Sequence, residues 1–392
     1  MTAPDSGAST AIWTTPERRA LRESVTTFAR KEIVPHLAGW EDAGELPREL
    51  HRTTADAGLL AIGFSEEVGG DGGNIIDSMI VTEAIIQAGG SSGLIASLYT
   101  HGIALPHIIA SGNADLIDAY VRPTLAGEII GSLGITEPGG GSDVAGITTR
   151  AERDGDEFVI NGSKTFITSG VRADFVTTAV RTGGDGFGGI SLLVIDKGLS
   201  GFTTSKPLKK MGWHCSDTAE LSFDSVRVPA DKIVGEVDGG FVLVMQQFVN
   251  ERLSMAVEAY ATAQRALDLA VDYARDRETF GKPLITRQVI RHKLVDMHRR
   301  TSAARALTRA AVERATTTDT TDPALILDAV MAKNQAVEAC EWVVSESVQI
   351  HGGMGYMRES EIDRHYRDTR ILGIGGGATE VLNDLAAKLL GY

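Results

Sequence analysis

The chain has 392 residues, and 38 Lys and Arg oppose 52 Asp and Glu, which gives a formal net charge of −14 at pH 7. This acidic balance argues against broad nucleic-acid binding, which needs a basic surface. Cys215 and Cys340 are too few for a disulfide framework, so we expect buried thiols and a reducing, cytoplasmic setting. No apolar run reaches the ~18–20 residues that cross a bilayer. Residues 1–11 lack the features of a signal peptide and are expected to form a disordered tail.

Residues 12–130 are predicted to be helical. Thr15 is placed to cap a helix whose first position is Pro16. Apolar residues then recur at helical spacing, and further helices are expected at 75–89, 94–110 and 113–126.

The periodicity changes over 131–238, which we expect to form a small β domain. Its predicted strands are rich in Val, Ile, Phe and Thr, and they cover 156–161, 164–168, 174–181, 190–195 and 219–228. The helical period returns in 239–392. Thr286 is a candidate cap for one of the four long helices expected there, at 241–275, 286–315, 323–350 and 377–390. The elements run α, then β, then α, which is an α+β order, and the length of the chain allows two or three domains.

The segment Gly134–Asp143, which reads GITEPGGGSD, is the most informative in the chain. Its three consecutive glycines let backbone N–H groups approach an anionic ligand without a Cβ in the way. Thr136 and Ser142 add hydroxyls that can bond a polar ring or a phosphate. This segment alone indicates only a cradle for an anion or a cofactor.

Three further motifs follow it, and they are Asn161–Thr168, Arg275–Lys282 and Tyr366–Asp368. In this order and at this spacing, the segments resemble the acyl-CoA dehydrogenase family of flavoproteins, from about Pro16 to the C-terminus. The resemblance implies three domains: an N-terminal α-helical domain, a middle β-barrel-like domain and a C-terminal four-helix bundle. It also implies FAD as cofactor, bound between the β domain and the C-terminal helices.

The resemblance assigns residues of one chain to this FAD. Phe166 and Thr168 would cover the isoalloxazine ring, and many relatives carry Trp where this chain has Phe166. A packed core aromatic is the alternative for Phe166. The full set assigned within one chain is Leu133, Ile135, Thr136, Gly141, Ser142, Phe166, Thr168, Ala378 and Glu380.

A second set would reach the FAD of a neighbouring subunit, which implies a homo-oligomer and, by resemblance, a homotetramer. Arg277 suits a pyrophosphate because its guanidinium is always charged and bonds bidentately; a surface arginine at a helix end is the alternative. The set is Arg277, Phe280, Gln288, Gln349, Gly352 and Gly353.

The reaction that the resemblance implies needs a base for the α-proton of a saturated thioester. Most members carry it as Glu in a Tyr-Glu-Gly-Thr segment, but this chain reads Gly-Gly-Gly-Ala from Gly375, with Gly376 at the usual Glu position. A branch that includes the long-chain and isovaleryl-CoA dehydrogenases carries the base in a Glu-Arg-Leu motif. Glu251-Arg252-Leu253 matches that motif.

Helix geometry supports Glu251 independently. Residues three and four apart share a helix face, so Glu251 is the one charge on a stripe with Val244, Phe248 and Met255. A carboxylate there is costly without a function or a partner. The alternative is an ion pair with a cation from another element.

The implied function is dehydrogenation of a saturated acyl-CoA to trans-2-enoyl-CoA, with electrons passed to an electron-transfer flavoprotein. Gly376 would donate its N–H to the thioester oxygen and leave room for a long or branched chain, while Arg252 and Ser142 would contact the CoA portion. Three alternatives stay open: an oxygen-using acyl-CoA oxidase, a flavin monooxygenase, and a base-less acyl-CoA-binding paralogue or subunit of a mixed oligomer. An acyl carrier protein thioester is also compatible with the sequence.

Two patterns in the sequence could be mistaken for a dinucleotide-binding motif and a metal site. Gly373–Ala378 fits the G-x-G-x-x-G/A fingerprint, but the βαβ unit and the later acidic residue that this fingerprint needs are missing. His101 and His107 lie in an apolar segment without a cluster of other ligands, so we expect packing and no metal site.

Overall fold

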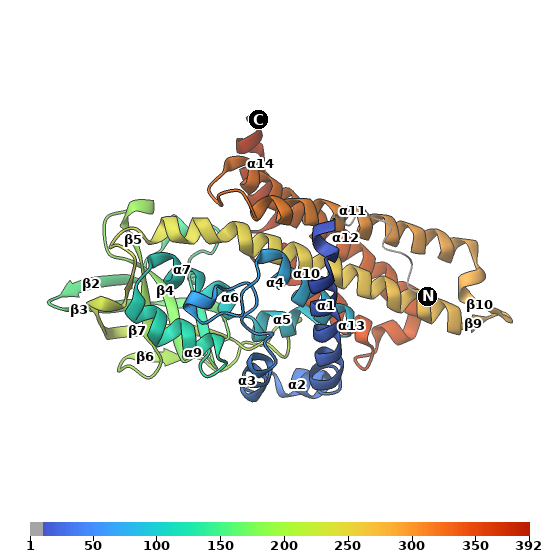
Figure 1. Ribbon diagram of the computed structural model, residues 1–392, viewed down its shortest axis with the longest axis horizontal. Coiled ribbons are helices and arrows are strands. Elements are labelled where there is room, and N and C mark those ends of the chain that lie inside the picture. The colour runs from blue at the N-terminus through green and yellow to red at the C-terminus, as the bar shows by residue number, and fades with distance from the viewer. Residues whose placement is uncertain (1–10) are drawn as a thin grey trace.

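The computed structural model describes residues 11–392, and the expected tail lies outside them except for Ala11, which begins a short 3-10 helix. The strands of the large sheet gather at one end of the molecule, and long helices extend to the other end, where a short two-stranded hairpin lies (Figure 1). Helix α10 (Gly240–Asp276) has 37 residues and joins the two ends. At 1.5 Å per residue it is about 55 Å long.

Helices make up the N-terminal part of the described chain. Thr15 caps α1, since its side chain accepts a hydrogen bond from the Arg18 N–H at 3.3 Å, and Pro16 is the first helical residue, which confirms both predictions. The helices of this part are α1 (Pro16–Phe28), α2 (Leu37–Ala43), α3 (Glu49–Asp56), α4 (Ile75–Gln87), α5 (Ser92–Leu98), α6 (His101–Ala104), α7 (Pro106–Ser111), α8 (Ala114–Leu116) and α9 (Arg122–Leu125).

The single helix predicted over 94–110 is wrong, because the chain forms α5, α6 and α7 in its place. Pro106 opens α7 and cannot continue a preceding helix, since it has no N–H and its ring crowds the turn before it. Within residues 11–392, no single helix has the length and apolar character to cross a membrane. Segments Ser92–Leu98 and His101–Ser111 meet that test only as a pair, bent by 56°.

The middle of the chain forms one sheet of eight strands in the order β6-β7-β3-β2-β4-β5-β8, with β1 parallel to β4. The predicted strands 156–161 and 164–168 are one strand, β3, whose pairing with β7 shifts between Lys164 and Ile167. The strands are β1 (Gly131–Gly134), β2 (Arg150–Asp154), β3 (Glu157–Thr168), β4 (Phe175–Arg181), β5 (Ile190–Asp196), β6 (Phe202–Thr204), β7 (Thr218–Pro229) and β8 (Ile233–Val234).

The C-terminal part is helical as predicted, apart from a two-stranded hairpin. Thr286 does not cap the second long helix: it lies in a 3-10 turn, its hydroxyl donates to the Pro283 carbonyl at 2.7 Å, and Arg287 is the residue before the helix. The short helix α13 has no counterpart among the predicted elements. After α10 come β9 (Glu278–Thr279), β10 (Lys282–Pro283), α11 (Gln288–Ala315), α12 (Pro323–His351), α13 (Glu361–Thr369) and α14 (Thr379–Leu390).

Helix α10 is fixed by a largely apolar core shared with α4, α11 and α12. A buried hydrogen-bond network also holds this helix. Arg309 donates to the Glu83 carboxylate at 3.1 Å, and the Tyr260 hydroxyl donates to the same carboxylate at 3.3 Å. Burial alone would raise the pKa of Glu83, but the guanidinium groups of Arg22 and Arg309 hold it at about 2. Both apolar packing and charged hydrogen bonds therefore fix the position of the helix that carries Glu251.

Candidate active site

Glu251 lies on α10 beside the C-terminal glycine loop (Gly375–Gly377). A methyl group built on Gly376 would lie 3.6 Å from Glu251 Oε1, so two positions 125 residues apart in the sequence meet here. Glu251 also lines a pocket of about 230 Å³ of empty space, including space open to solvent. The other residues that line it are Gly102, Ile103, His107, Leu133, Gln247 and Phe248.

The Glu251 carboxylate has no hydrogen bond or ion pair to any residue in the described part of the chain. Burial raises its pKa above the ordinary value, while the positive charges of Arg252 and Lys333 act in the opposite direction. A half-buried carboxylate without a partner, at the edge of a pocket, has the chemistry of a general base. The alternative of an ion pair with a cation from another element is thus not met: Lys333 is near enough to lower the pKa of Glu251 but forms no ion pair with it.

Lys333 on α12 holds the C-terminal glycine loop in place. Its Nζ donates to the Gly375 carbonyl at 3.0 Å and to the Gly377 carbonyl at 2.6 Å. Burial lowers the pKa of Lys333 to about 8. Sequence reasoning missed this residue, although a lysine inside the apolar stretch of a long helix is itself a signal that the ammonium has a buried partner.

The loop is shaped so that position 376 favours glycine. Gly376 has φ +62° and Gly377 has φ +99°, which side-chain-bearing residues rarely adopt. A Cβ on Gly376 would also collide with Met255 Sδ. The volume beside Gly376 that sequence reasoning expected to be free for substrate is filled by the Met255 thioether, an unbranched side chain that can rearrange.

Arg252, predicted to hold the CoA portion of the substrate, is buried next to the base. Its guanidinium carbon lies 5.1 Å from the centre of the Phe248 ring. Its Nε has no hydrogen-bond partner within residues 11–392. Burial lowers its pKa and the Glu251 carboxylate raises it. An incompletely bonded guanidinium at this place is suited to an anionic or carbonyl ligand.

The cradle segment (Gly134–Asp143) runs beside β3. The Thr165 N–H donates to the Thr136 carbonyl at 2.9 Å, and Ser132 Oγ donates to the Thr168 carbonyl at 2.6 Å. The structure thereby brings together the positions that the sequence assigned to a flavin within one chain, namely Leu133, Ile135, Thr136, Gly141, Ser142, Phe166 and Thr168.

This region fits FAD on its own geometry. Phe166 has φ +59° and its side chain is 69% exposed, so a strand irregularity presents an aromatic ring to a ligand. Within residues 11–392, the hydroxyls of Thr136 and Thr168 and the backbone N–H groups of Gly141 and Ser142 have no hydrogen-bond partner. An exposed ring beside unpaired donors suits a flavin and its phosphates.

Glu137 lies inside the cradle segment and anchors it to neighbouring parts of the chain. The sequence analysis did not identify this residue. Its buried carboxylate accepts from Lys164 Nζ at 2.8 Å and from the N–H groups of Thr148 and Thr149 at 2.8 and 2.9 Å. Burial alone would raise the pKa of Glu137, but the Lys164 ammonium holds it at about 2. The cradle is consequently fixed from within rather than by a ligand.

The residues predicted to act across subunits lie at the other end of α10, near the β9–β10 hairpin (Figure 1). Asp276 is 25 residues after Glu251 on this helix, which corresponds to about 38 Å. The Tyr273 and His351 rings stack at 4.5 Å and join this end to α12. The structure therefore gathers Arg277, Phe280, Gln288, Gln349, Gly352 and Gly353 into one region, away from the cradle segment.

Phe280 is the outermost residue of this region, with a side chain that is 98% exposed and φ +51°. Arg277, Gln288 and Gln349 are also exposed. The Arg287 guanidinium lies over the Phe280 ring at 5.8 Å, and most of the ring faces outward.

Two further assigned positions lie beyond the C-terminal glycine loop. Ala378 precedes α14, and Glu380 is exposed in the first turn of that helix. The run Gly373–Ala378 begins at the last residue of a 3-10 helix and leads by turns into α14, so the dinucleotide fingerprint has no βαβ unit around it. Asp368 of the fourth motif accepts the Trp213 N–H at 2.6 Å and thus ties α13 to the middle of the chain.

The remaining titratable candidates have structural surroundings. His101 packs against the rings of Phe64 and Tyr99, and burial lowers its pKa to about 4. His107 was expected only to pack, yet it also lines the Glu251 pocket. Cys215 and Cys340 are free and buried, as predicted. No group of three metal-binding side chains occurs in the part of the chain that the structure describes.

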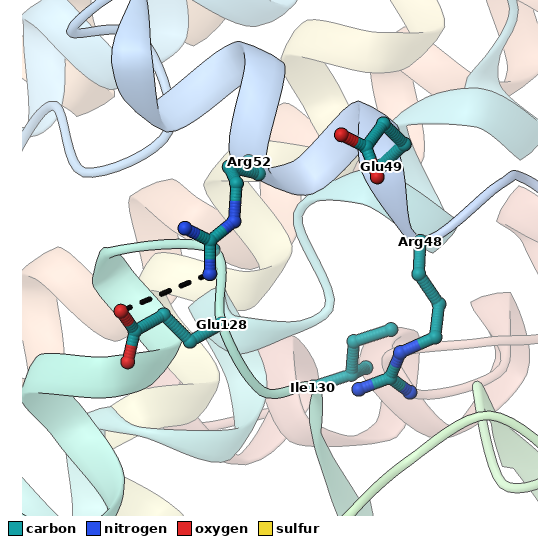
Figure 2. A pocket seen from close by; sticks show the side chains of 6 residues that line it. Arg48, Glu49, Arg52, Glu128 and Ile130 are labelled. Carbon is teal, nitrogen blue, oxygen red and sulfur yellow. Dashed lines mark ion pairs between the residues drawn. The ribbon is translucent and has the colours of Figure 1, made fainter.

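A second pocket lies away from this site and shares none of its residues. Figure 2 shows Arg52 reaching toward Glu128, with an N–O distance of 3.8 Å, while Arg48 and Ile130 lie across the opening. Arg48 is already paired with Asp174 at 2.5 Å. Both arginines at this pocket thus already have carboxylate partners.

Comparisons with known proteins cover the chain almost end to end. Three family models match: "Acyl-CoA dehydrogenase, N-terminal domain" at residues 15–128, "middle domain" at 132–226 and "C-terminal domain" at 238–391. The long-chain specific acyl-CoA dehydrogenase of Sus scrofa is 36% identical over 95% of this chain and 86% of its own length.

Solved structures agree with the family models. A probable acyl-CoA dehydrogenase from Mycobacterium abscessus has a TM-score of 0.95 and 64% identity, covering 97% of this chain and 100% of its own. Butyryl-CoA dehydrogenase from Megasphaera elsdenii has a TM-score of 0.90 and 32% identity, covering 97% and 99%. The chain therefore belongs to the acyl-CoA dehydrogenase family, FAD-binding oxidoreductases that act on acyl-CoA.

Proposed function

We propose that this chain dehydrogenates a saturated acyl-CoA to the trans-2-enoyl-CoA with Glu251 as the base for the α-proton. One observation carries the proposal: the unpaired Glu251 carboxylate faces the C-terminal glycine loop, 3.6 Å from where a side chain on Gly376 would begin. FAD, when bound, supplies the acceptor for the hydride that leaves the β-carbon.

Each nearby residue has a defined task in this proposal. The N–H of Gly376 donates to the thioester oxygen as negative charge develops there. Lys333 keeps that N–H in position through the carbonyls on either side of it. Glu251 takes the proton in a pocket lined by Phe248, Leu133 and Ile103, where exclusion of water strengthens its basicity.

The cofactor is held, in this proposal, by two subunits. Thr136, Ser142 and Thr168 bond it from the cradle side, with Phe166 over the ring. Arg277 and Phe280 come from a second copy of the chain, together with Gln288, Gln349, Gly352 and Gly353. The support is the separation of about 38 Å along α10, which a single chain does not close. We propose that each chain has domains at 12–130, 131–238 and 239–392. We also propose that the assembly is a homotetramer.

The acyl group that we propose is long or branched. The Glu-Arg-Leu motif at Glu251 resembles the one that the long-chain and isovaleryl-CoA branch carries. The pig relative at 36% identity is named for long chains. Arg252 and Ser142 contact the CoA portion. Electrons leave to an electron-transfer flavoprotein, and the reaction takes place in the cytoplasm.

The test is anaerobic reduction of the bound flavin by a panel of short, long and branched acyl-CoAs, followed by absorbance. The native protein is expected to bleach, and Glu251→Gln to bleach ~10²–10⁴ times more slowly. Glu152→Gln, an exposed glutamate on β2, is the matched control and should bleach normally. Bleaching that survives in Glu251→Gln would show that another group is the base. A protein that binds FAD but bleaches with no thioester would instead be a binding paralogue.

Oxygen reactivity separates the dehydrogenase from the oxidase. Reduced native enzyme is expected to reoxidise slowly in air and rapidly with an electron-transfer flavoprotein. Rapid reoxidation by oxygen, with hydrogen peroxide as product, would favour the oxidase.

A further inference from the structure

Helix α10 carries a second buried carboxyl group, Glu258, which the reaction proposed above does not use. Its side chain is 6% exposed, and its Oε2 has no hydrogen-bond partner within residues 11–392. Glu83, a buried glutamate that packs in the same core, is by contrast bonded to Arg309 and Tyr260. Burial of an unbonded polar group is costly, and native structures rarely keep one without a ligand or a bound water.

Glu258 lies on the same face of α10 as Glu251. Seven residues are nearly two helical turns, so the two side chains point the same way, about 10 Å apart along the axis. Met255 lies between them on this face, and its thioether abuts Gly376, where the thioester is placed. Neither Met255 nor Glu258 lines the pocket at Glu251, so an acyl chain that continued along this face would reach Glu258 only by displacing the flexible Met255 side chain.

The chemistry of Glu258 restricts what it can bind. Burial, and after it the negative charge of Glu251, raises the pKa of Glu258 to about 8, so the carboxyl is mostly protonated at pH 7. A protonated carboxyl offers one O–H donor and a carbonyl acceptor. It matches a neutral oxygen-bearing group, whereas an unsubstituted hydrocarbon chain would leave it unbonded and a carboxylate would add a second negative charge.

We propose that Glu258 is a substrate-binding residue that hydrogen-bonds a hydroxyl or keto group on the acyl chain. An extended chain advances about 1.2 Å per bond, so the group lies near the tenth carbon. This inference rests on the proposed function, because it takes the thioester to lie between Glu251 and Gly376.

The test compares matched thioesters of about eight to twelve carbons, one with a terminal hydroxyl and one without, at each length. Affinity is measured by calorimetry with FAD-loaded protein carrying Glu251→Gln, which prevents turnover, and flavin reduction is measured with Glu251 intact. Each measurement is repeated with Glu258→Leu and with Glu258→Gln. The amide keeps a donor and an acceptor, so Glu258→Gln is the conservative control.

With Glu258 present, the hydroxylated chain is expected to bind at least about tenfold more tightly than the plain chain at one length. Glu258→Leu should abolish or invert this ratio, and Glu258→Gln should keep most of it. An equal ratio in the native residue and in Glu258→Leu overturns the inference while leaving Glu251 as base untouched. Failure of every thioester to bind overturns the proposed function and this inference with it.

Discussion

The two ends of helix α10 contrast in how much of the site each completes. Around Glu251, one chain supplies a base, the loop at Gly376 and a lysine that fixes that loop. At the hairpin end, Phe280 is 98% exposed and its ring meets only the Arg287 guanidinium, at 5.8 Å, among the described residues. Variants of the first region should therefore affect folding and the chemical step, and variants of the second should affect cofactor binding and assembly.

The largest expected effect is on folding, from Lys164→Met. This change leaves the Glu137 carboxylate buried without its cation, although two backbone N–H groups still reach it. Breaking one side of a buried ion pair costs about 3–5 kcal/mol. The free energy of unfolding, from denaturant titration, is expected to fall by that amount. Lys209→Met, at an exposed position, is the control, and equal stability of the two variants would show that the ion pair does not hold the cradle segment.

A smaller effect, of a different kind, is expected from Arg277→Gln. If Arg277 bonds the cofactor of a second subunit, losing a charged hydrogen bond of about 1.5–3 kcal/mol weakens FAD binding about 10- to 100-fold. The stability of the apoprotein should stay unchanged, because the exposed Arg277 side chain makes no hydrogen bond or ion pair within residues 11–392. FAD affinity is measured by fluorescence quenching on refilling the apoprotein. Unchanged affinity would remove Arg277 from the cofactor site.

The shift in pH dependence expected from Lys333→Met is the smallest of these effects. A slower reaction at every pH is expected beside it, because the C-terminal glycine loop loses the two hydrogen bonds that hold it. The base must be deprotonated, and the positive charge of Lys333 lowers the pKa of Glu251 against the effect of burial. Removing that charge raises the pKa of Glu251, so the acid limb of the rate profile moves to higher pH. The effect is full well below pH 8, where Lys333 is charged, and it fades as the pH rises through about 8. A profile of flavin reduction against pH measures it, and an acid limb that stays in place or moves down contradicts the proposed field.

Much of the fold could be predicted from the sequence because its signals are local. The apolar periodicity of α10, α11 and α12 and the Thr15–Pro16 start signal depend on neighbours a few residues away. Pro106 marks the break before α7, although it lies within an apolar run, but it does not mark the break between α5 and α6. Thr286 was misread because a hydroxyl before a helix can equally bond a 3-10 turn.

The residues of the candidate site could be predicted only where a short stretch of sequence identifies them by itself. Glu251 could be found from its own helix face, since helix geometry places Phe248 and Met255 beside it. Lys333 and Glu258 could not be assigned in the same way, because their meaning depends on which loop or substrate faces them. No local pattern in the sequence records that contact.

Isotope exchange at the α-carbon of a saturated acyl-CoA tests the central claim, that Glu251 removes the α-proton, most directly. The enzyme is incubated with the thioester in deuterated buffer without oxygen, and deuterium in the recovered substrate is measured by mass spectrometry. The account predicts exchange in the native protein and in Glu152→Gln, and its loss by at least about a hundredfold in Glu251→Gln. Exchange at the native rate in Glu251→Gln would contradict it.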